Sequence, residues 1–365
     1  MKRNLTYALS LLVMLMLGSS VTAQVQTFQW QNVDRQYIVQ APSSIDRPLP
    51  IVFFLHGLGD NVTNVNNSFN LSFLAEYYNW VFVAPQALSA GYGTMWNAGL
   101  MNSSTDDSGF LMALLDTLCT QYPIDQDSVF FTGFSMGGFM THRMAIEHGD
   151  RINACAPVSG LITSSVSNEI AAAPVRMLHI HGTSDNVVGY NGYSQYFNMS
   201  LGLGVDAILD YWKIVNGFNS NVMVDTLPDL KDDGLLFVRY KYDCDTELEH
   251  LKVIGGTHDW YVSGQNDVGY MEYIHDFFVG STDGVKQHEA AEKGKLMVSP
   301  NPTTGLVTVV SDKAVEVSIV DVMGKVLDNV SVGSGSTLLD LSDYADGVYF
   351  IRTSEGLSAK VIVNK

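Results

Sequence analysis

Five short apolar runs between positions 24 and 280 constrain the fold of this chain most strongly. The runs are almost continuously apolar, and they lie at 51–55, 81–84, 129–132, 154–158 and 177–180. Strands buried on both faces have this pattern, and they belong to parallel sheets covered by helices. Helical spacing at 110–118 and 139–146 falls between the runs. The sequence therefore predicts repeated β-α-β units that form an α/β domain with a mostly parallel sheet over residues 24–280.

A change of pattern after position 280 predicts a second domain. Residues 281–294 are polar and lack an apolar face, so we interpret them as a linker. Residues 295–365 contain short alternating segments at 307–310, 315–320, 347–352 and 359–363. Because alternation is typical of strands with one buried face, we expect a small all-β sandwich there.

The first 23 residues have the three regions of a secretory signal peptide. Lys2 and Arg3 precede an apolar run at 9–17, which is followed by Val-Thr-Ala at 21–23. This run is shorter than the ~20 residues that a membrane-spanning helix needs, so we expect cleavage rather than a membrane anchor. We expect no transmembrane segment in the mature chain.

Charge and cysteine content exclude several kinds of partner and site. The chain has 38 Asp and Glu against 20 Lys and Arg, a net charge of -18, whereas nucleic-acid binding needs clustered cations. Cys119, Cys155 and Cys244 are too few and too scattered for a disulfide-built scaffold or for paired metal ligands, so we expect no metal site. Export is compatible with one disulfide, and the three possible pairings stay open.

The candidate nucleophile is Ser135, in Gly-Phe-Ser-Met-Gly-Gly at 133–138. It follows a predicted buried strand and precedes a predicted helix, as a G-x-S-x-G nucleophile elbow requires. Glycines beside the serine lack a Cβ atom, so the chain can turn sharply and hold the hydroxyl at the edge of the sheet. The alternative is an ordinary glycine-rich turn between a strand and a helix.

A serine hydroxyl needs a base, and the base needs a carboxylate to fix its tautomer. Asp185 follows the predicted strand at 177–180, and His258 follows another apolar segment in Gly-Gly-Thr-His at 255–258. The sequence therefore predicts a catalytic triad of Ser135, His258 and Asp185. The alternatives are a turn-capping role for Asp185 and a solvated loop position for His258.

Four further residues are candidates for binding the substrate. The backbone N–H groups of Met136, which follows the nucleophile, and of Leu58, in His-Gly-Leu-Gly at 56–59, are predicted to form the oxyanion hole. Trp96 and Trp260 are candidates for stacking on an aromatic acyl group or a sugar, with packing in the core as the alternative.

Further motifs surround these residues: Arg-Gln-Tyr-Ile-Val-Gln-Ala-Pro at 35–42, Asp-Asp-Ser-Gly-Phe at 106–110 and Pro-Val-Ser-Gly at 157–160. With the triad segments, they make residues 28–279 resemble the secreted feruloyl esterase and polyhydroxybutyrate depolymerase family, within carbohydrate esterase family one. The resemblance implies an α/β-hydrolase fold, hydrolysis of carboxylic esters without a cofactor, and the same triad. Similar sequences often have Asn-Gly-Cys where this chain has Phe218, which implies that Cys244 lacks that partner.

The last seventy residues resemble the C-terminal sorting domain of type IX secretion. The resemblance rests on Ser-Pro-Asn-Pro-Thr-Thr-Gly at 299–305, Asp-Val-Met-Gly-Lys at 321–325, Gly-Val-Tyr-Phe-Ile-Arg at 347–352 and Lys-Val-Ile-Val-Asn-Lys at 360–365. It implies a secretion machinery as partner and a final location at the cell surface or outside the cell. The alternative is a carbohydrate-binding β-sandwich.

The sequence as a whole predicts a secreted serine esterase that acts on feruloyl or acetyl esters of plant polysaccharides. A polyhydroxyalkanoate depolymerase or a serine peptidase could use the same triad. A surface binding protein on an inactive hydrolase scaffold is the alternative from another class.

Overall fold

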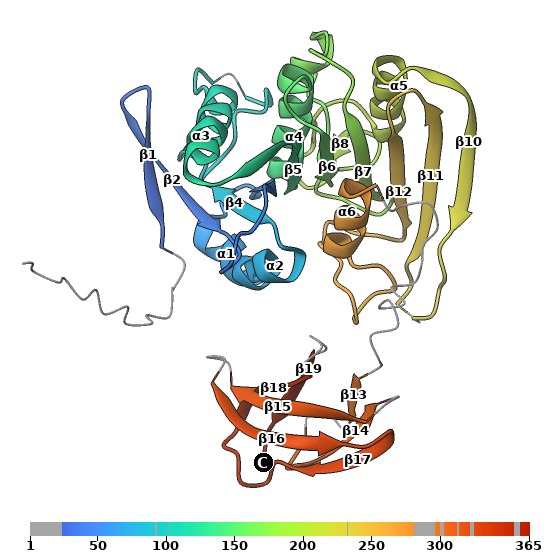
Figure 1. The fold of residues 1–365 in the computed structure, drawn as a ribbon. Coiled ribbons are helices and arrows are strands. Elements are labelled where there is room, and N and C mark those ends of the chain that lie inside the picture. The colour runs from blue at the N-terminus through green and yellow to red at the C-terminus, as the bar shows by residue number, and fades with distance from the viewer. Residues whose placement is uncertain are drawn as a thin grey trace, which may run out of the picture. The chain divides into compact units, whose positions relative to one another are not determined.

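The computed structural model describes residues 24–280 except positions 92, 102 and 232, and residues 296–365 except positions 300–302, 312–313, 322–324 and 354–357. The chain divides into two compact units, one containing residues 24–280 and the other containing residues 296–365 (Figure 1). The predicted signal peptide at 1–23 and the predicted linker at 281–294 lie outside the described residues.

A ten-stranded sheet in the order β1-β2-β4-β3-β5-β6-β7-β12-β11-β10 forms the centre of the first unit. Its strands are β1 (Gln26–Trp30), β2 (Val33–Gln40), β3 (Leu49–Leu55), β4 (Val81–Pro85), β5 (Ile124–Phe134), β6 (Ala154–Val158), β7 (Arg176–Gly182), β10 (Phe218–Thr226), β11 (Leu236–Cys244) and β12 (Leu248–Ile254). The central strands β4, β3, β5, β6, β7 and β12 are parallel, and antiparallel pairs flank them on both sides. The mostly parallel sheet predicted from the sequence is confirmed.

Helices cover both faces of this sheet (Figure 1). On one face, α3 (Asp107–Gln121), α4 (Met136–His148) and α5 (Val205–Val215) pack on strand residues such as Phe53 and Phe131. On the other face, α1 (Val62–Phe69), α2 (Leu71–Tyr78) and α6 (Tyr270–Phe278) pack on residues such as Phe54 and Phe130. Neighbouring residues of one strand thus enter opposite cores, which explains the continuous apolar runs.

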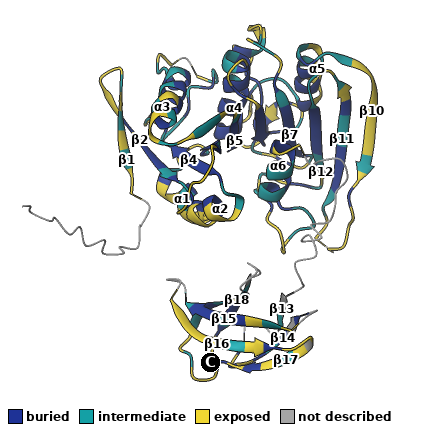
Figure 2. Cartoon of the chain, in the orientation of Figure 1, coloured by how far each residue is buried: buried dark blue, intermediate teal, exposed yellow. Residues whose placement is uncertain are grey.

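Burial decreases from the centre of the sheet to its edge (Figure 2). Every residue of β4 and β6 is buried, whereas β10 at the edge is exposed along most of its length. The unit also contains a 3-10 helix at Val166–Asn168 and a separate hairpin of β8 (Tyr193–Ser194) and β9 (Met199–Ser200). Among the described residues, no helix is long and apolar enough to cross a membrane.

The second unit consists of two antiparallel sheets around one apolar core. One sheet contains β13 (Leu296–Ser299), β14 (Leu306–Ser311) and β17 (Gly335–Asp340). The other contains β16 (Val326–Val332), β15 (Val315–Asp321), β18 (Gly347–Thr353) and β19 (Ser358–Val363). Val307 and Leu339 from the first sheet share the core with Ile319, Ile351 and Val361 from the second. This arrangement is the expected small β-sandwich.

Candidate active site

Ser135 lies at a sharp turn between β5 and α4. Its φ of 54° and ψ of -118° are unusual for a residue other than glycine. The turn brings backbone segments so close together that a Cβ atom on Gly137 would overlap the carbonyl oxygen of Leu55. A Cβ atom on Gly133 would lie 2.6 Å from the carbonyl carbon of Gly137. The two glycines therefore permit the packing that holds the strained serine in place.

The structure brings Ser135, His258 and Asp185 together in one hydrogen-bonded line. His258 follows β12 and Asp185 follows β7, so both lie at the same sheet edge as the serine. Nδ1 of His258 lies 2.7 Å from Oδ2 of Asp185, and Nε2 of His258 lies 2.9 Å from Oγ of Ser135. Because the carboxylate can only accept, Nδ1 carries the proton and Nε2 is free to accept the serine proton.

Asp185 is buried and held by its own loop. Its Oδ1 accepts hydrogen bonds from the backbone N–H groups of Val187 and Val188, at 2.9 and 2.8 Å. Nε2 of His181 donates to the carbonyl oxygen of Val188 at 2.7 Å and lies 3.8 Å from Oδ2 of Asp185. Burial lowers the pKa of His181, so this imidazole is neutral near pH 7. These contacts fix the carboxylate while leaving its charge available to His258.

The loop at residues 56–60 runs beside the serine. A Cβ atom on Gly57 would lie 3.7 Å from Cβ of Ser135. His56, the first residue of this loop, is buried. Its Nδ1 donates to the Gly57 carbonyl oxygen at 2.7 Å, and its Nε2 accepts the N–H of Ala87 at 3.0 Å. Burial lowers the pKa of His56, which agrees with this neutral tautomer. Leu58 is partly exposed on this loop.

Met136, the other predicted oxyanion residue, is the first residue of α4. The first four N–H groups of an α-helix have no partner within the helix, and the helix dipole makes this end attractive to negative charge. The Met136 N–H therefore belongs to a set of donors beside Ser135 that can receive an anion.

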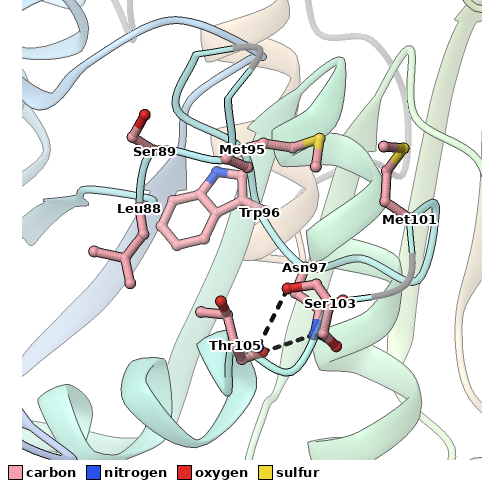
Figure 3. Close-up of a pocket in the computed structure, with 9 residues that line it drawn as sticks. Leu88, Ser89, Met95, Trp96, Asn97, Met101, Ser103 and Thr105 are labelled. Carbon is pink, nitrogen blue, oxygen red and sulfur yellow. Dashed lines mark hydrogen bonds between the residues drawn. The ribbon is translucent and has the colours of Figure 1, made fainter.

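Trp96 packs in the core and does not present an open ring face. Its side chain is only 1% exposed, its ring lies 5.1 Å from that of His56, and its Nε1 donates to the His56 carbonyl oxygen at 3.0 Å. Trp96 also contributes to the wall of a small pocket, together with Leu88 and Met95 (Figure 3). The burial of Trp96 fits the core-packing alternative, and substrate stacking on Trp96 stays a prediction.

Trp260 lies in a half-buried aromatic cluster close to His258. Its ring centroid is 5.2 Å from that of Phe54 and 5.0 Å from that of Phe69. Phe134, whose ring is 4.8 Å from the His258 ring, also contacts Trp260 at 6.3 Å. Substrate stacking on Trp260 stays a prediction. Phe134 directly precedes Ser135, but no pattern in the sequence marked its ring as part of the site.

The other core histidines are poor candidates for a base. Nε2 of His142 lies 3.2 Å from Nδ1 of His179, and Nε2 of His250 lies 2.9 Å from the Tyr190 hydroxyl. Burial lowers the pKa of both His142 and His250 to about 3, so both are neutral near pH 7. Within the described residues, no group of three or more His, Cys, Asp or Glu could hold a metal ion. The three cysteines are free thiols.

A parallel sheet flanked by helices, with a nucleophile elbow after β5 and the acid and histidine after β7 and β12, defines the α/β-hydrolase fold. The solved structure of an acetyl xylan esterase from Aspergillus awamori has the same fold, with a TM-score of 0.51. It is 16% identical in sequence, and the match covers 70% of this chain and 99% of that one.

Comparison with protein families identifies both units. Residues 37–199 match the model of the Phospholipase/Carboxylesterase family, and residues 297–364 match the model of the Secretion system C-terminal sorting domain. The chain is 31% identical over 160 residues to a bifunctional acetylxylan esterase/xylanase of Neocallimastix patriciarum and 30% identical over 166 residues to feruloyl esterase C of Emericella nidulans. These matches cover 44% and 43% of this chain, but only 23% and 57% of the two relatives.

Proposed function

We propose that this chain is a secreted serine carboxylic ester hydrolase that acts on feruloyl or acetyl esters of plant polysaccharides. The hydrogen-bonded line from Ser135 through His258 to Asp185 carries the proposal, because it joins a nucleophile to a base and the base to an orienting carboxylate. The names of the relatives, a feruloyl esterase and an acetylxylan esterase/xylanase, support these acyl groups and this polymer.

In the proposed reaction, Oγ of Ser135 attacks the ester carbonyl carbon while Nε2 of His258 takes the hydroxyl proton. The tetrahedral intermediate breaks its bond to the alcohol oxygen, which receives that proton from His258 and leaves. Water then attacks the acyl-serine with His258 again as base, and the acid product and free Ser135 are released. Asp185 remains charged throughout and stabilises the imidazolium.

The N–H groups of Leu58 and Met136 would bind the oxyanion of both tetrahedral intermediates. The close approach of Gly57 to Ser135 supports a role for the loop at 56–60, and the start of α4 supports Met136. Loss of one such donor typically costs about 3 kcal/mol of transition-state stabilisation. No metal ion or cofactor takes part in this proposal.

The sorting domain supports export through a secretion machinery to the cell surface or outside the cell. We propose a signal peptide at 1–23, a catalytic domain at 24–280, a linker at 281–294 and the sorting domain at 295–365. An ester on a plant polysaccharide is a suitable substrate for such an enzyme, because the polymer does not enter the cell.

Labelling with a fluorophosphonate tests the nucleophile. The probe should attach to the wild-type protein at Ser135, and Ser135→Ala should abolish both labelling and ester hydrolysis. A wild-type protein that the probe does not label would favour the inactive binding protein.

A substrate panel tests the bond and the acyl group. We expect turnover of methyl ferulate or acetylated xylan to exceed turnover of hydroxybutyrate oligomers and of peptides. Preference for either of the last two would replace the proposed substrate by that of a depolymerase or a peptidase, while leaving the triad in place.

A further inference from the structure

The segment that follows Asp185 carries no charged side chain. Residues 186–205 contain no Asp, Glu, Lys, Arg or His, although the whole chain has a net charge of -18. The segment is instead rich in tyrosine, asparagine, glycine and serine. It contains the β8–β9 hairpin, which we call the aromatic hairpin (residues 193–200).

The aromatic hairpin exposes four large apolar side chains. Tyr193, Tyr196, Phe197 and Met199 are 41%, 72%, 46% and 44% exposed. Single exposed apolar residues are normal on a protein surface, but a group of them within one short hairpin indicates a binding surface.

Two hydrogen bonds and one ring contact lie within the aromatic hairpin. The Tyr193 hydroxyl donates to Oδ1 of Asn198 at 2.5 Å, and the N–H of Phe197 donates to Oγ of Ser194 at 2.9 Å. The Tyr196 and Phe197 rings meet edge to face, with centroids 4.9 Å apart and planes at 88°. A preformed surface loses little conformational entropy when a ligand binds.

Backbone hydrogen bonds connect the aromatic hairpin to the edge of the sheet where Ser135, Asp185 and His258 lie. The N–H of Tyr196 donates to the carbonyl oxygen of Asn186 at 2.9 Å, and Asn186 directly follows Asp185. After the hairpin, the N–H of Leu203 donates to the carbonyl oxygen of Ile162 at 2.9 Å, in the segment that follows β6. Both contacts lie beyond the carboxyl ends of parallel strands, where α/β sheets bind their ligands.

We propose that the aromatic hairpin binds an uncharged sugar chain, beside the ester that reaches Ser135. Aromatic ring faces suit the C–H faces of sugar rings, and the surrounding amide and hydroxyl groups suit sugar hydroxyls without favouring an ionic ligand. The strongly negative chain also disfavours an acidic polymer. This inference rests on the proposed esterase function, and it assigns the polymer-binding surface of that same site.

Affinity electrophoresis of the full chain through gels that contain neutral arabinoxylan tests the binding surface. All proteins carry Ser135→Ala, so that no ester is hydrolysed during the run. Adding Tyr196→Ala and Phe197→Ala should weaken binding by about three- to tenfold, whereas Tyr196→Phe, which keeps the ring, should preserve it.

The matched control is Tyr77→Ala, which removes a 61% exposed tyrosine from α2. It should bind arabinoxylan like its parent, and equal thermal melting of all variants verifies that they are folded. If the parent is not retarded, or if the hairpin variants bind as tightly as Tyr77→Ala, the aromatic hairpin is not a sugar-binding surface.

A kinetic measurement separates this inference from the esterase proposal. For this measurement the hairpin variants keep Ser135. Their ratio of kcat/KM for feruloylated arabinoxylan to kcat/KM for methyl ferulate should be about three- to tenfold lower than that of the wild type. If the hairpin variants cleave both esters and the ratio of the two kcat/KM values is unchanged, the sugar-binding surface is refuted, but the esterase function is not. If the arabinoxylan gel retards the protein through the aromatic hairpin but the wild type cleaves neither ester, the esterase function is refuted, but the sugar-binding surface is not.

Discussion

The indole Nε1 of Trp96 donates a hydrogen bond of 3.0 Å to the backbone carbonyl oxygen of His56. The contact joins the segment around Trp96 to the loop at 56–60, whose Gly57 approaches Ser135. A second contact between the same segments runs from the N–H of Gly59 to the carbonyl oxygen of Thr94, at 2.8 Å. Trp96 therefore positions the loop that we propose to bind the oxyanion.

Replacement of Trp96 by phenylalanine tests this positioning role. Trp96→Phe keeps an aromatic ring but loses the hydrogen bond to His56, so the loop can shift relative to Ser135. We expect kcat for a small ester to fall about tenfold with little change in KM, because the oxyanion forms only after binding. Steady-state kinetics with methyl ferulate measures both constants.

Trp212→Phe is the matched control for that variant. Nε1 of Trp212 also donates inside the core, to Nδ1 of His142 at 3.3 Å, but far along the chain from the loop at 56–60. Each variant should lose about 1 kcal/mol of stability, and Trp212→Phe should keep its kcat. Equal kinetic losses in the two variants would assign the effect of Trp96→Phe to general destabilisation.

Asp185→Asn tests the orientation of His258. The asparagine can offer an amide N–H to Nδ1, which favours the tautomer with its proton on Nε2 and removes the acceptor for the serine proton. We expect kcat to fall about 10⁴-fold, while the fold is retained. Asp206→Asn, in the exposed first turn of α5, provides a matched control that should turn over esters normally. A loss of less than tenfold for Asp185→Asn would contradict the proposed triad.

The sequence predicted the central strands, and it selected the three residues that the structure brings together as a candidate triad, because both depend on local signals. Strands such as β6 are buried on both faces, so their residues form uninterrupted apolar runs. Ser135 lies between a predicted strand and a predicted helix, and Asp185 follows another predicted strand. The proximity of the three candidate residues could therefore be predicted from the rule that parallel strands end at one edge.

The edge strands and the roles of the aromatic residues could not be predicted in this way. β10 is mostly exposed and β1 alternates between partial burial and exposure, so neither has an apolar run. The sequence analysis named Trp96 as a stacking candidate and did not name Tyr196, but the Trp96 side chain is 1% exposed and the Tyr196 side chain is 72% exposed. Only the tertiary contacts of each ring decide this difference.

Gly137→Ala tests the packing beneath the nucleophile elbow. A Cβ atom there would overlap the backbone of Leu55 in β3, which cannot move without disturbing the central sheet. We expect the free energy of unfolding to fall by at least about 3 kcal/mol. Gly57→Ala is the control, since its Cβ would make ordinary contacts of 3.7 Å, and it should change stability by less than about 1 kcal/mol. Urea unfolding compares the two variants. Similar denaturation midpoints would refute the close approach of Gly137 to the backbone of Leu55.

The buried Glu249 predicts a pH dependence of stability. Burial raises the pKa of Glu249 from 4.5 to about 7, and the Tyr273 hydroxyl donates to its Oε1. Between these two pKa values, the folded protein holds a proton that the unfolded chain has lost. The stabilising contribution of Glu249 is therefore complete below about pH 4.5 and is lost as the pH rises through about 7.

Glu249→Gln isolates this effect because glutamine stays neutral at every pH and keeps an acceptor for Tyr273. Relative to the wild type, the variant should gain stability between pH 4.5 and pH 8, by up to about 3 kcal/mol. Urea unfolding of both proteins at several pH values gives the difference directly, and the contributions of unchanged groups cancel. If the difference in the free energy of unfolding stays constant over this range, or if the variant becomes less stable than the wild type at higher pH, Glu249 is ionised in the folded core.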